Sequence, residues 1–130
     1  MSKIIIATLF FTIVCVAGCQ NAAMQQNNIK QISARQAGTA TAGKSVQFID
    51  VRTVDEYNSG HAPQTVNLPL DSLEQSISKL DKSKPVYIIC QTGRRSQKGA
   101  EILEKNGFKD LYNIEGGTSA WEKAGLPIEK

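Results

Sequence analysis

The sequence predicts a single α/β domain with a mainly parallel central sheet that helices cover on both faces. Two apolar runs, SVQFIDV (45–51) and VYIIC (86–90), are nearly continuous, as expected of strands that are buried on both faces. Strand patterns and helical patterns alternate along the chain, which is typical of a parallel sheet. The composition agrees, because 130 residues with 41% hydrophobic and 21% charged residues suit one small globular core.

Turn and capping signals separate the elements in the first half of the predicted domain. After the segment IKQIS we expect a small helix over about 34–39 and then the strand at 45–51. Thr53 is a helix-start signal followed by two acidic residues, and Gly60 is a stop signal. The loop HAPQT then leads to a short strand, VNLP (66–69).

A helix is predicted next, because apolar side chains recur at i, i+3, i+7 and i+10 from Leu70 to Leu80, with Asp71 or Ser72 as its cap. The remaining elements are the strand at 86–90, a helix over about 96–105, a strand over 110–114 and a short helix within 116–125. Ligands of such open sheets bind beyond the carboxyl ends of the strands, and Cys90 lies at such an end.

The first 18 residues are interpreted as a signal peptide. Lys3 gives a positive start, an apolar stretch runs from Ile4 to Val14, and small residues precede Cys19 in VAGC. This end resembles the lipobox of bacterial lipoproteins, which implies cleavage before Cys19 and lipidation of Cys19. An ordinary secretory signal and an N-terminal anchor helix are the alternatives.

This interpretation divides the chain into a signal peptide (1–18), a lipid-anchored tether (19–28) and a folded domain (29–130). The tether is polar and aperiodic, as flexible linkers are. The domain is then expected in the bacterial cell envelope, exported to the periplasmic side and anchored in a membrane. Gln20, directly after the lipidated cysteine, favours the outer membrane.

The net charge of +3 and the pI of about 8.8 come from basic residues that are scattered along the sequence. Without a basic run, a nucleic-acid partner is not expected. Removal of residues 1–18 deletes one lysine and leaves a net charge of about +2. That value does not predict strong attraction to anionic lipid.

Cysteine usage singles out Cys90. Cys15 would leave with the signal peptide and Cys19 would carry lipid, so Cys90 is the one thiol left in the mature chain, with no partner for an internal disulfide. An unpaired thiol in an exported protein needs a reason, which is either burial as a small apolar residue or chemical reactivity.

The segment CQTGRRS (90–96) favours reactivity. The backbone must turn tightly between a strand and a helix there, and Gly93 can adopt a positive φ. The N–H groups of such a turn form an anion-binding nest with the helix N-terminus, and Arg94 and Arg95 add positive charge. This field lowers the pKa of a thiol and makes it nucleophilic. A buried cysteine followed by an ordinary turn is the plainer alternative.

The spacing within this segment distinguishes two cysteine chemistries. Cysteine-dependent phosphatases carry C-x5-R, whereas the sixth residue after Cys90 is Ser96, and the last arginine, Arg95, is the fifth. The loop is one residue short for a phosphate group, which disfavours a phosphatase or an arsenate reductase. A tighter ring suits a smaller group, such as one additional sulfur atom on Cys90.

Four segments resemble the rhodanese family over roughly 32–127, namely IDVRTVDEYNSGH, VNLPL, CQTGRRS and EGGTSAWEKAGLP. The resemblance implies a three-layer domain with a mainly parallel five-stranded sheet. It also implies sulfurtransfer through a transient persulfide on Cys90, without another cofactor, and a brace for the loop from Asp50 and Arg52. The residues that it assigns to the persulfide cradle are Gln91, Thr92, Gly93, Arg94, Arg95 and Ser96.

The implied partners are a small sulfur donor, such as thiosulfate or a persulfide, and a thiophilic acceptor, such as cyanide, a small thiol or a protein thiol. A non-catalytic lipoprotein module that binds an anion or a partner is the alternative. Arg95 is expected to direct its guanidinium or its backbone donors toward the carbonyl groups of the loop and an incoming anionic donor. The rim GHAPQT departs from the family pattern G-H-I-P-G-A, since Gln64 replaces a glycine.

Two other conspicuous side chains are given structural roles. His61, the sole histidine, is interpreted as forming a structural hydrogen bond, because an ionised thiol needs no general base. Trp121 is interpreted as part of the core. No cluster of histidine, cysteine or carboxylate residues has the spacing of metal ligands.

Overall fold

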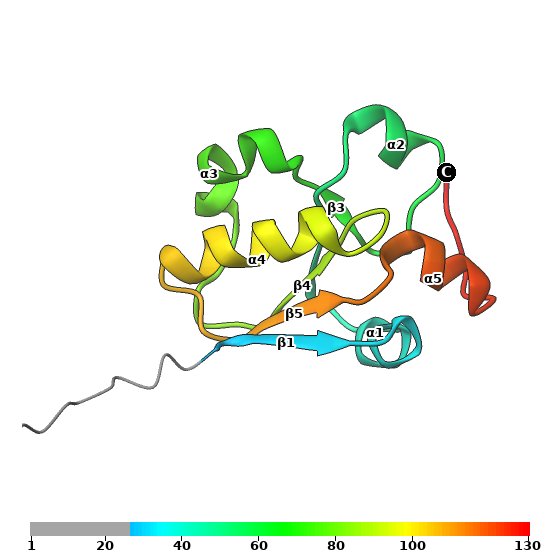
Figure 1. The fold of residues 1–130 in the computed structure, drawn as a ribbon, viewed down its shortest axis with the longest axis horizontal. Helices are drawn as coiled ribbons and strands as arrows, with labels where there is room; N and C mark the ends of the chain where they lie inside the picture. Colours follow the sequence, from blue (N-terminus) through cyan, green and yellow to red (C-terminus); the bar gives the residue numbers. More distant parts are fainter. Residues whose placement is uncertain (1–26) are drawn as a thin grey trace, which may run out of the picture.

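The computed structural model describes residues 27–130, so the expected signal peptide, Cys19 and most of the expected tether lie outside it. Five strands form one sheet in the order β1-β5-β4-β2-β3, and every neighbouring pair is parallel. Figure 1 shows this arrangement. The predicted α/β fold with five strands is confirmed, and the sheet is wholly rather than mainly parallel.

The strands are β1 (Ile29–Ile32), β2 (Gln47–Asp50), β3 (Val66–Asn67), β4 (Val86–Ile89) and β5 (Leu111–Ile114). The helices are α1 (Ala34–Thr41), α2 (Val54–Asn58), α3 (Leu73–Ser76), α4 (Arg94–Lys105) and α5 (Gly117–Lys123), and two 3-10 turns, η1 (Leu70–Ser72) and η2 (Ile77–Lys79), flank α3. Within residues 27–130, no helix is long and apolar enough to cross a membrane.

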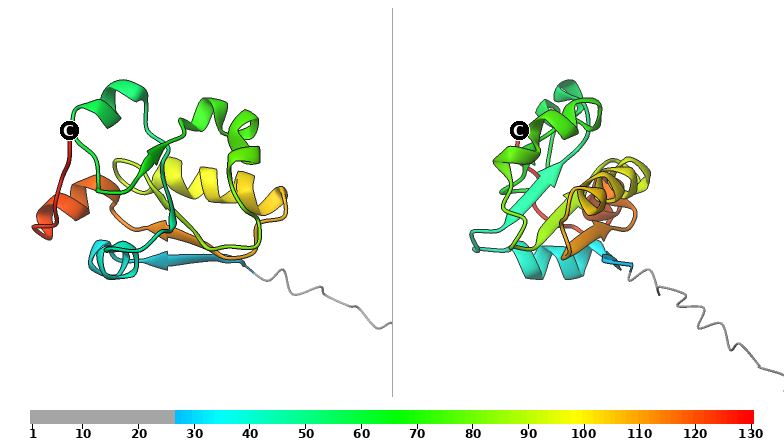
Figure 2. Two further views of the ribbon diagram at one scale, coloured as in Figure 1. Left: turned by 180° about the vertical axis from the view of Figure 1, so that it is seen from behind. Right: turned by 90° about the vertical axis from the view of Figure 1, so that its left-hand side faces the viewer.

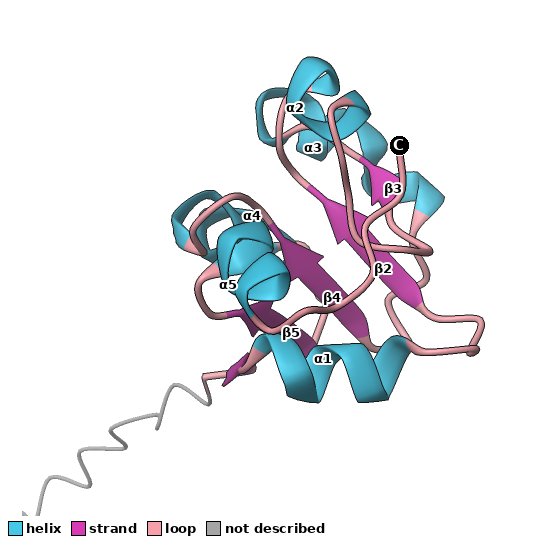
Figure 3. Ribbon diagram, turned by 90° about the vertical axis from the view of Figure 1, so that its right-hand side faces the viewer, coloured by secondary structure: helices cyan, strands magenta, loops and turns pink. Residues whose placement is uncertain are grey.

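Two apolar clusters, one on each face of the sheet, form the core. On one face, Leu73 of α3 and Leu103 of α4 pack with Ile88 of β4. On the other face, α1 packs against Phe48 of β2, and Trp121 of α5 joins this second cluster. Figures 2 and 3 show α1 on the face of the sheet opposite to α3 and α4. Burial of each large apolar side chain stabilises the folded state by about 1.5–3 kcal/mol, so the two clusters hold the sheet between them.

The carboxyl ends of the strands meet near α2 and α5, at the right of Figure 1. Helix α2 begins with the capping box that Thr53 predicts, in which the Thr53 hydroxyl accepts from the Glu56 N–H and the Glu56 side chain accepts from the Thr53 N–H. Because the strands are parallel, the segments that leave β2, β4 and β5 converge at this end of the sheet.

Three details differ from the sequence-based expectation. The segment IKQIS contains β1, an edge strand that pairs only with β5 and in which Ile29 alone is fully buried, so its apolar signal is weak. The helix expected over 70–80 is instead a 3-10, α, 3-10 succession, and Ser72 caps α3 without a side-chain hydrogen bond. Helix α4 starts at Arg94, two residues early, because Gly93 already takes the left-handed conformation that caps it.

Candidate active site

Cys90 directly follows β4, and the chain turns at Gly93 to enter α4. Gly93 has a φ of +96°, a conformation that side chains with a Cβ rarely adopt. A Cβ at Gly93 would also lie 3.2 Å from the Gly116 nitrogen and 3.4 Å from the Ile114 carbonyl oxygen. Both the turn and its packing against the segment after β5 therefore require the glycine.

The segment between β5 and α5 holds the backbone of the Cys90 loop from the other side. The Thr118 N–H and hydroxyl donate to the Cys90 carbonyl oxygen at 2.8 and 3.1 Å, and the Ser119 N–H donates to the Gln91 carbonyl oxygen at 3.1 Å. A Cβ at Gly117 would overlap the Cys90 carbonyl oxygen. In the sequence GGTS, the glycines therefore allow this segment to approach the Cys90 loop closely, and the threonine and serine donate hydrogen bonds to the backbone of the loop.

The Cys90 sulfur is buried and faces hydrogen-bond donors of its own loop. The Gly93 N–H donates to Sγ at 3.0 Å, and the Ser96 hydroxyl lies 3.3 Å from Sγ. Burial raises the pKa of the Cys90 thiol, but hydrogen bonds from the Ser96 hydroxyl and from the Ser96, Thr92 and Gly93 N–H groups outweigh burial and leave the pKa below its usual value. The loop thus favours a thiolate.

Asn113 of β5 is a site residue that the sequence reasoning missed. It is only 3% exposed, and its Oδ1 lies 2.5 Å from the Ser96 hydroxyl, whose single proton can be donated either to this oxygen or to the Cys90 sulfur. Its Nδ2 donates to the Gly93 carbonyl oxygen at 3.2 Å and to Gln31 Oε1 at 2.8 Å. Asn113 therefore positions both Ser96 and Gly93. A polar residue within the apolar run of the segment DLYNI was the available signal.

Asp50 and Arg52 form a buried ion pair beneath the loop. Arg52 Nη2 lies 2.8 Å from Asp50 Oδ2, and the two side chains are 3% and 0% exposed. Arg52 Nη1 donates to Gln91 Oε1 at 3.2 Å, and Nη2 also donates to the Gly60 carbonyl oxygen at 2.8 Å. Gln91 Nε2 in turn donates to the Ser119 hydroxyl at 2.9 Å. The pair thus contacts the loop through Gln91.

The expected orientation of Arg95 is wrong. Its guanidinium forms no hydrogen bond with the loop in the described residues and pairs instead with Glu56 of α2, with Nη1 and Nη2 at 2.7 and 2.8 Å from the two carboxylate oxygens. Glu56 is the last residue of the α2 capping box, so one carboxylate serves both the helix start and the arginine. The hydrogen bonds from Arg95 lead the effects that lower the pKa of Glu56 to about 2.

Thr92 and Arg94 complete the loop on its outer side. Both side chains are exposed, and Arg94 forms no ion pair within residues 27–130. Of the two arginines that follow Gly93, Arg94 is therefore the one whose charge remains unpaired.

His61, Trp121 and Gln64 lie among structural contacts. His61 Nδ1 forms a hydrogen bond with the Tyr57 carbonyl oxygen at 2.8 Å, and its ring stacks on Tyr57. Trp121 is 3% exposed, as expected of a core residue. Gln64 adopts a φ of +67°, and its side-chain amide can donate to the Thr41 and Lys44 carbonyl oxygens at 2.7 and 2.8 Å. Within residues 27–130, no group of three metal-ligating side chains comes together.

The structure is a parallel α/β domain in which hydrogen-bond donors surround a cysteine at the carboxyl end of a strand. The chain is a member of the family with a rhodanese-like domain, whose model matches residues 33–124. It is 36% identical over 98 residues to a Shewanella oneidensis protein named thiosulfate sulfurtransferase GlpE, covering 75% of this chain and 97% of that one.

Two solved structures are also similar. A rhodanese-like domain protein from Staphylococcus aureus has a TM-score of 0.67 and 36% identity, over 78% of this chain and 99% of that one. A Rhodopseudomonas palustris protein of unknown function, described as a possible tyrosine phosphatase, has a TM-score of 0.67 and 27% identity, over 78% of this chain and 85% of that one.

Proposed function

We propose that this protein is a rhodanese-type sulfurtransferase in which Cys90 carries sulfane sulfur as a persulfide. The observation that carries the proposal is the position of Sγ, 3.0 Å from the Gly93 N–H and 3.3 Å from the Ser96 hydroxyl at the carboxyl end of β4. Donors placed in this way stabilise a thiolate and the negative charge of a persulfide. The family membership and the name of the Shewanella relative support the same chemistry.

The proposed reaction has two displacement steps. The Cys90 thiolate attacks the outer sulfur of a donor such as thiosulfate, the sulfur–sulfur bond of the donor breaks, and sulfite leaves with the electron pair. A thiophilic acceptor, such as cyanide or a thiolate, then attacks the terminal sulfur of the persulfide. The persulfide bond breaks, and the Cys90 thiolate is regenerated without an external oxidant or reductant.

The burial of Cys90 favours a small donor. The residue is 1% exposed, so a donor must bring a single sulfur atom into the loop. A Cβ added at Gly93 would lie only 3.2 Å from the Gly116 nitrogen, so the segment after β5 leaves the loop little room to widen for a phosphate group. The unpaired charge of Arg94 can attract an anion such as thiosulfate.

The direct test is the intact mass of the protein after incubation with thiosulfate and removal of the excess. We expect a gain of one sulfur atom that Cys90→Ser abolishes, because a serine hydroxyl does not form a stable persulfide analogue. Transfer to cyanide should disappear with it. Turnover of Cys90→Ser within about tenfold of wild type, which corresponds to only ~1.4 kcal/mol of barrier, would contradict the proposal. So would hydrolysis of aryl phosphates as fast as sulfur transfer.

We also propose that the chain is exported and lipidated on Cys19, so that residues 19–28 tether the domain to a membrane of a bacterial envelope. Support comes from the VAGC segment and from the polar tether that follows it. Metabolic labelling with a fatty acid should mark the wild-type chain, and Cys19→Ala should abolish the label. A Cys19→Ala chain that still carries the label would contradict lipidation at this residue.

A further inference from the structure

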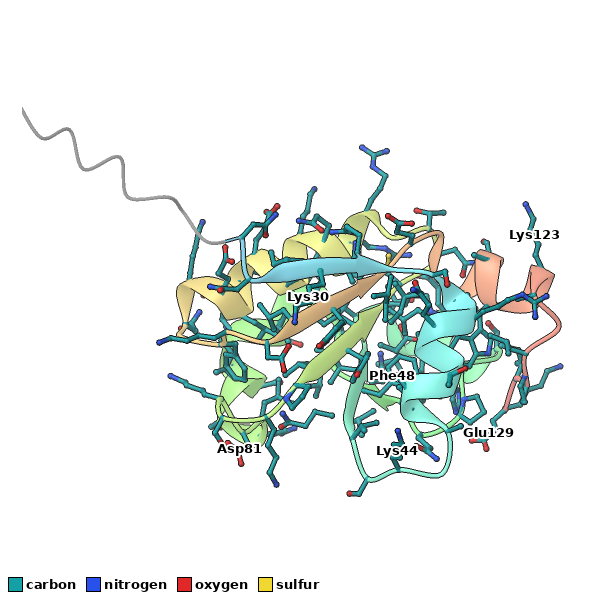
Figure 4. The ribbon with its side chains drawn as sticks, turned by 90° about the horizontal axis from the view of Figure 1, so that it is seen from below. Lys30, Lys44, Phe48, Asp81, Lys123 and Glu129 are labelled. Carbon is teal, nitrogen blue, oxygen red and sulfur yellow. The ribbon has the colours of Figure 1, made fainter. Side chains whose placement is uncertain are left out.

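The fold gathers lysines that are scattered in the sequence. The start of β1, the loop before β2 and the turns around η2, β4 and β5 all lie at the amino end of the parallel sheet. We name the exposed lysines there the lysine end, which comprises Lys30, Lys44, Lys79, Lys82, Lys84, Lys105 and Lys109. In Figure 4, Lys30 lies over the sheet near the middle of the view, whereas Lys123 of α5 lies at the right-hand edge.

Contacts between the loops show that these lysines share one surface. Lys44 and Lys84 line one groove together with Tyr87. Lys82 reaches the turn at Gly107, because a Cβ there would lie 3.9 Å from Lys82 Nζ, and Lys105 and Lys109 flank that turn. Lysines of the loop before β2, of the loop before β4 and of the turn after α4 are therefore neighbours, although the sequence separates Lys44 from Lys109 by 65 residues.

The charge of the domain is unevenly distributed between the two ends. The lysine end holds seven cations against three carboxylates, those of Asp81, Glu104 and Asp110, whereas the rest of residues 27–130 holds seven cations and nine carboxylates. Only Lys30 and Lys84 form ion pairs there, both exposed, at 3.3 and 3.8 Å. The small net charge of the chain therefore conceals a basic end and a slightly acidic remainder.

The tether enters the domain at the lysine end. Ile29 opens β1, and the Asn28 N–H donates to Glu104 Oε2 at 3.0 Å, which fixes the entry point beside Lys105. From Cys19 to Ile29 the chain advances ten residues, or at most about 35 Å when fully extended. A chain anchored at Cys19 would therefore keep this end within reach of the lipid headgroups, where even weak attraction acts at high effective concentration.

We propose that the lysine end is a docking surface for an anionic membrane, on which the domain rests with Cys90 facing away from the lipid. The proposal rests on the proposed anchor at Cys19. Because β4 runs from the lysine end to Cys90, docking at one end of the sheet exposes the sulfur-carrying loop at the other. The donor and the acceptor would then reach Cys90 from the aqueous side, while the domain stays on the membrane surface.

The test is amine labelling of the full-length lipidated chain, reconstituted in vesicles that contain phosphatidylglycerol or in vesicles of phosphatidylcholine alone. A short pulse of an acylating reagent, read residue by residue by mass spectrometry, gives the accessibility of each lysine. On the anionic vesicles we expect Lys82, Lys84, Lys105 and Lys109 to react about threefold or more slowly than on neutral vesicles. Lys98 and Lys123 should react equally on both, and about 0.5 M salt should remove the difference, because salt screens exposed charges.

Two triple variants with the same change in net charge sharpen the test. Lys82→Glu/Lys84→Glu/Lys109→Glu should lose the protection of the remaining lysines of the lysine end. Arg35→Glu/Lys98→Glu/Lys123→Glu, which alters exposed cations without ion pairs in the described part of the chain, should keep it. Both variants should load sulfur on Cys90 as wild type does.

Several outcomes would overturn the proposal. These are equal labelling on both kinds of vesicle, protection of Lys123 instead, loss of protection in both triple variants, or protection by a soluble oligonucleotide but not by anionic vesicles. Failure of the anchor would appear separately as an absent fatty-acid mass, and failure of sulfurtransfer as an absent sulfur on Cys90.

Discussion

The two ends of the sheet use basic residues in opposite ways. At the carboxyl end, Arg52 is buried against Asp50 and Arg95 is held by Glu56, so both guanidinium groups have fixed positions. At the amino end, the lysines are exposed, and most form no ion pair within residues 27–130. A charge that is removed from water needs a partner, whereas a solvated charge does not. Arg52 and Arg95 are therefore held by carboxylates, whereas Arg94 and most lysines of the amino end have no ionic partner within residues 27–130 and can attract an anion or a charged surface.

The largest effect is expected when a buried ion pair is broken, and an exposed ion pair provides the comparison. Asp50→Asn removes the carboxylate from Arg52, which is 2% exposed, and should lower the free energy of unfolding by about 3–5 kcal/mol. Asp81→Asn at the amino end removes the exposed partner of Lys84 at 3.8 Å and should cost about 1 kcal/mol or less. Denaturant unfolding of both variants measures the difference. Similar losses would show that the two ends are not distinct.

A second comparison uses two glycines that both have positive φ. Gly117→Ala, at the carboxyl end, places a Cβ against the Cys90 carbonyl oxygen and 2.7 Å from the Gln91 carbonyl carbon, so the backbone of the loop must shift. We expect a loss of about 3 kcal/mol and impaired sulfur loading. Gly43→Ala at the amino end meets no atom within 4 Å and should cost only the conformational term, about 1–2 kcal/mol. Equal losses in thermal unfolding would argue against a tightly packed loop.

The features that the sequence predicted correctly depend on neighbours in the chain. The apolar runs at 45–51 and 86–90 gave the central strands, and Thr53 with Glu56 gave the start of α2. A glycine three residues after Cys90 gave the turn that brings its N–H to Sγ. Such local signals act through backbone conformation, which sequence patterns report directly.

The features that it missed depend on residues that are distant in the chain. Glu56 and Arg95 are 39 residues apart, and Ser96 and Asn113 are 17 apart, so neither contact leaves a periodic pattern. The edge strand β1 has one neighbour and a mostly exposed middle, so its propensity is weak. The lysine end arises only because parallel strands bring their amino ends together. These contacts, strand β1 and the lysine end all depend on tertiary packing, which cannot be inferred from the periodicity of the sequence.

The third prediction concerns the electrostatics of the carboxyl end. Ser96→Ala removes the hydroxyl donor that lies 3.3 Å from Sγ, so the pKa of the Cys90 thiol should rise. One charge-assisted hydrogen bond is worth about 1.5–3 kcal/mol, so its loss should raise the pKa of the thiol measurably. The pH dependence of the alkylation rate measures it, and the rate at neutral pH should fall. Asp50 with Arg52 and Glu56 with Arg95 also face this region, and they remain unchanged in the variant.

Two controls separate this electrostatic role from packing. Ser96→Thr keeps a hydroxyl and should restore a low thiol pKa, whereas Ser119→Ala removes a hydroxyl that contacts Gln91 rather than the sulfur and should leave the thiol pKa near that of wild type. An unchanged alkylation profile in Ser96→Ala would show that the backbone donors alone stabilise the thiolate.

The smallest expected effect concerns the exposed pair at the carboxyl end. The pKa of Glu56 is lowered to about 2, chiefly by its hydrogen bonds with Arg95. Because the pKa in the folded state lies below the usual 4.5, the stabilisation is present above about pH 4.5 and is lost as the pH falls toward 2. Both side chains remain about one third exposed, at 34% and 36%, so solvent screening limits the contribution to about 1 kcal/mol or less.

Glu56→Gln should therefore reduce the free energy of unfolding by about 1 kcal/mol or less at pH 7, and the difference from wild type should nearly vanish at pH 2. Denaturant unfolding at both pH values measures it, with Glu74→Gln as a matched control on an exposed carboxylate that forms no ion pair in the described part of the chain. A constant difference across this range would mean that Glu56 acts through its capping bonds with Thr53, since a glutamine can keep those bonds only in part. In that case Arg95 would be free to turn toward an anion in the loop, and the amino and carboxyl ends would differ less than the structure indicates.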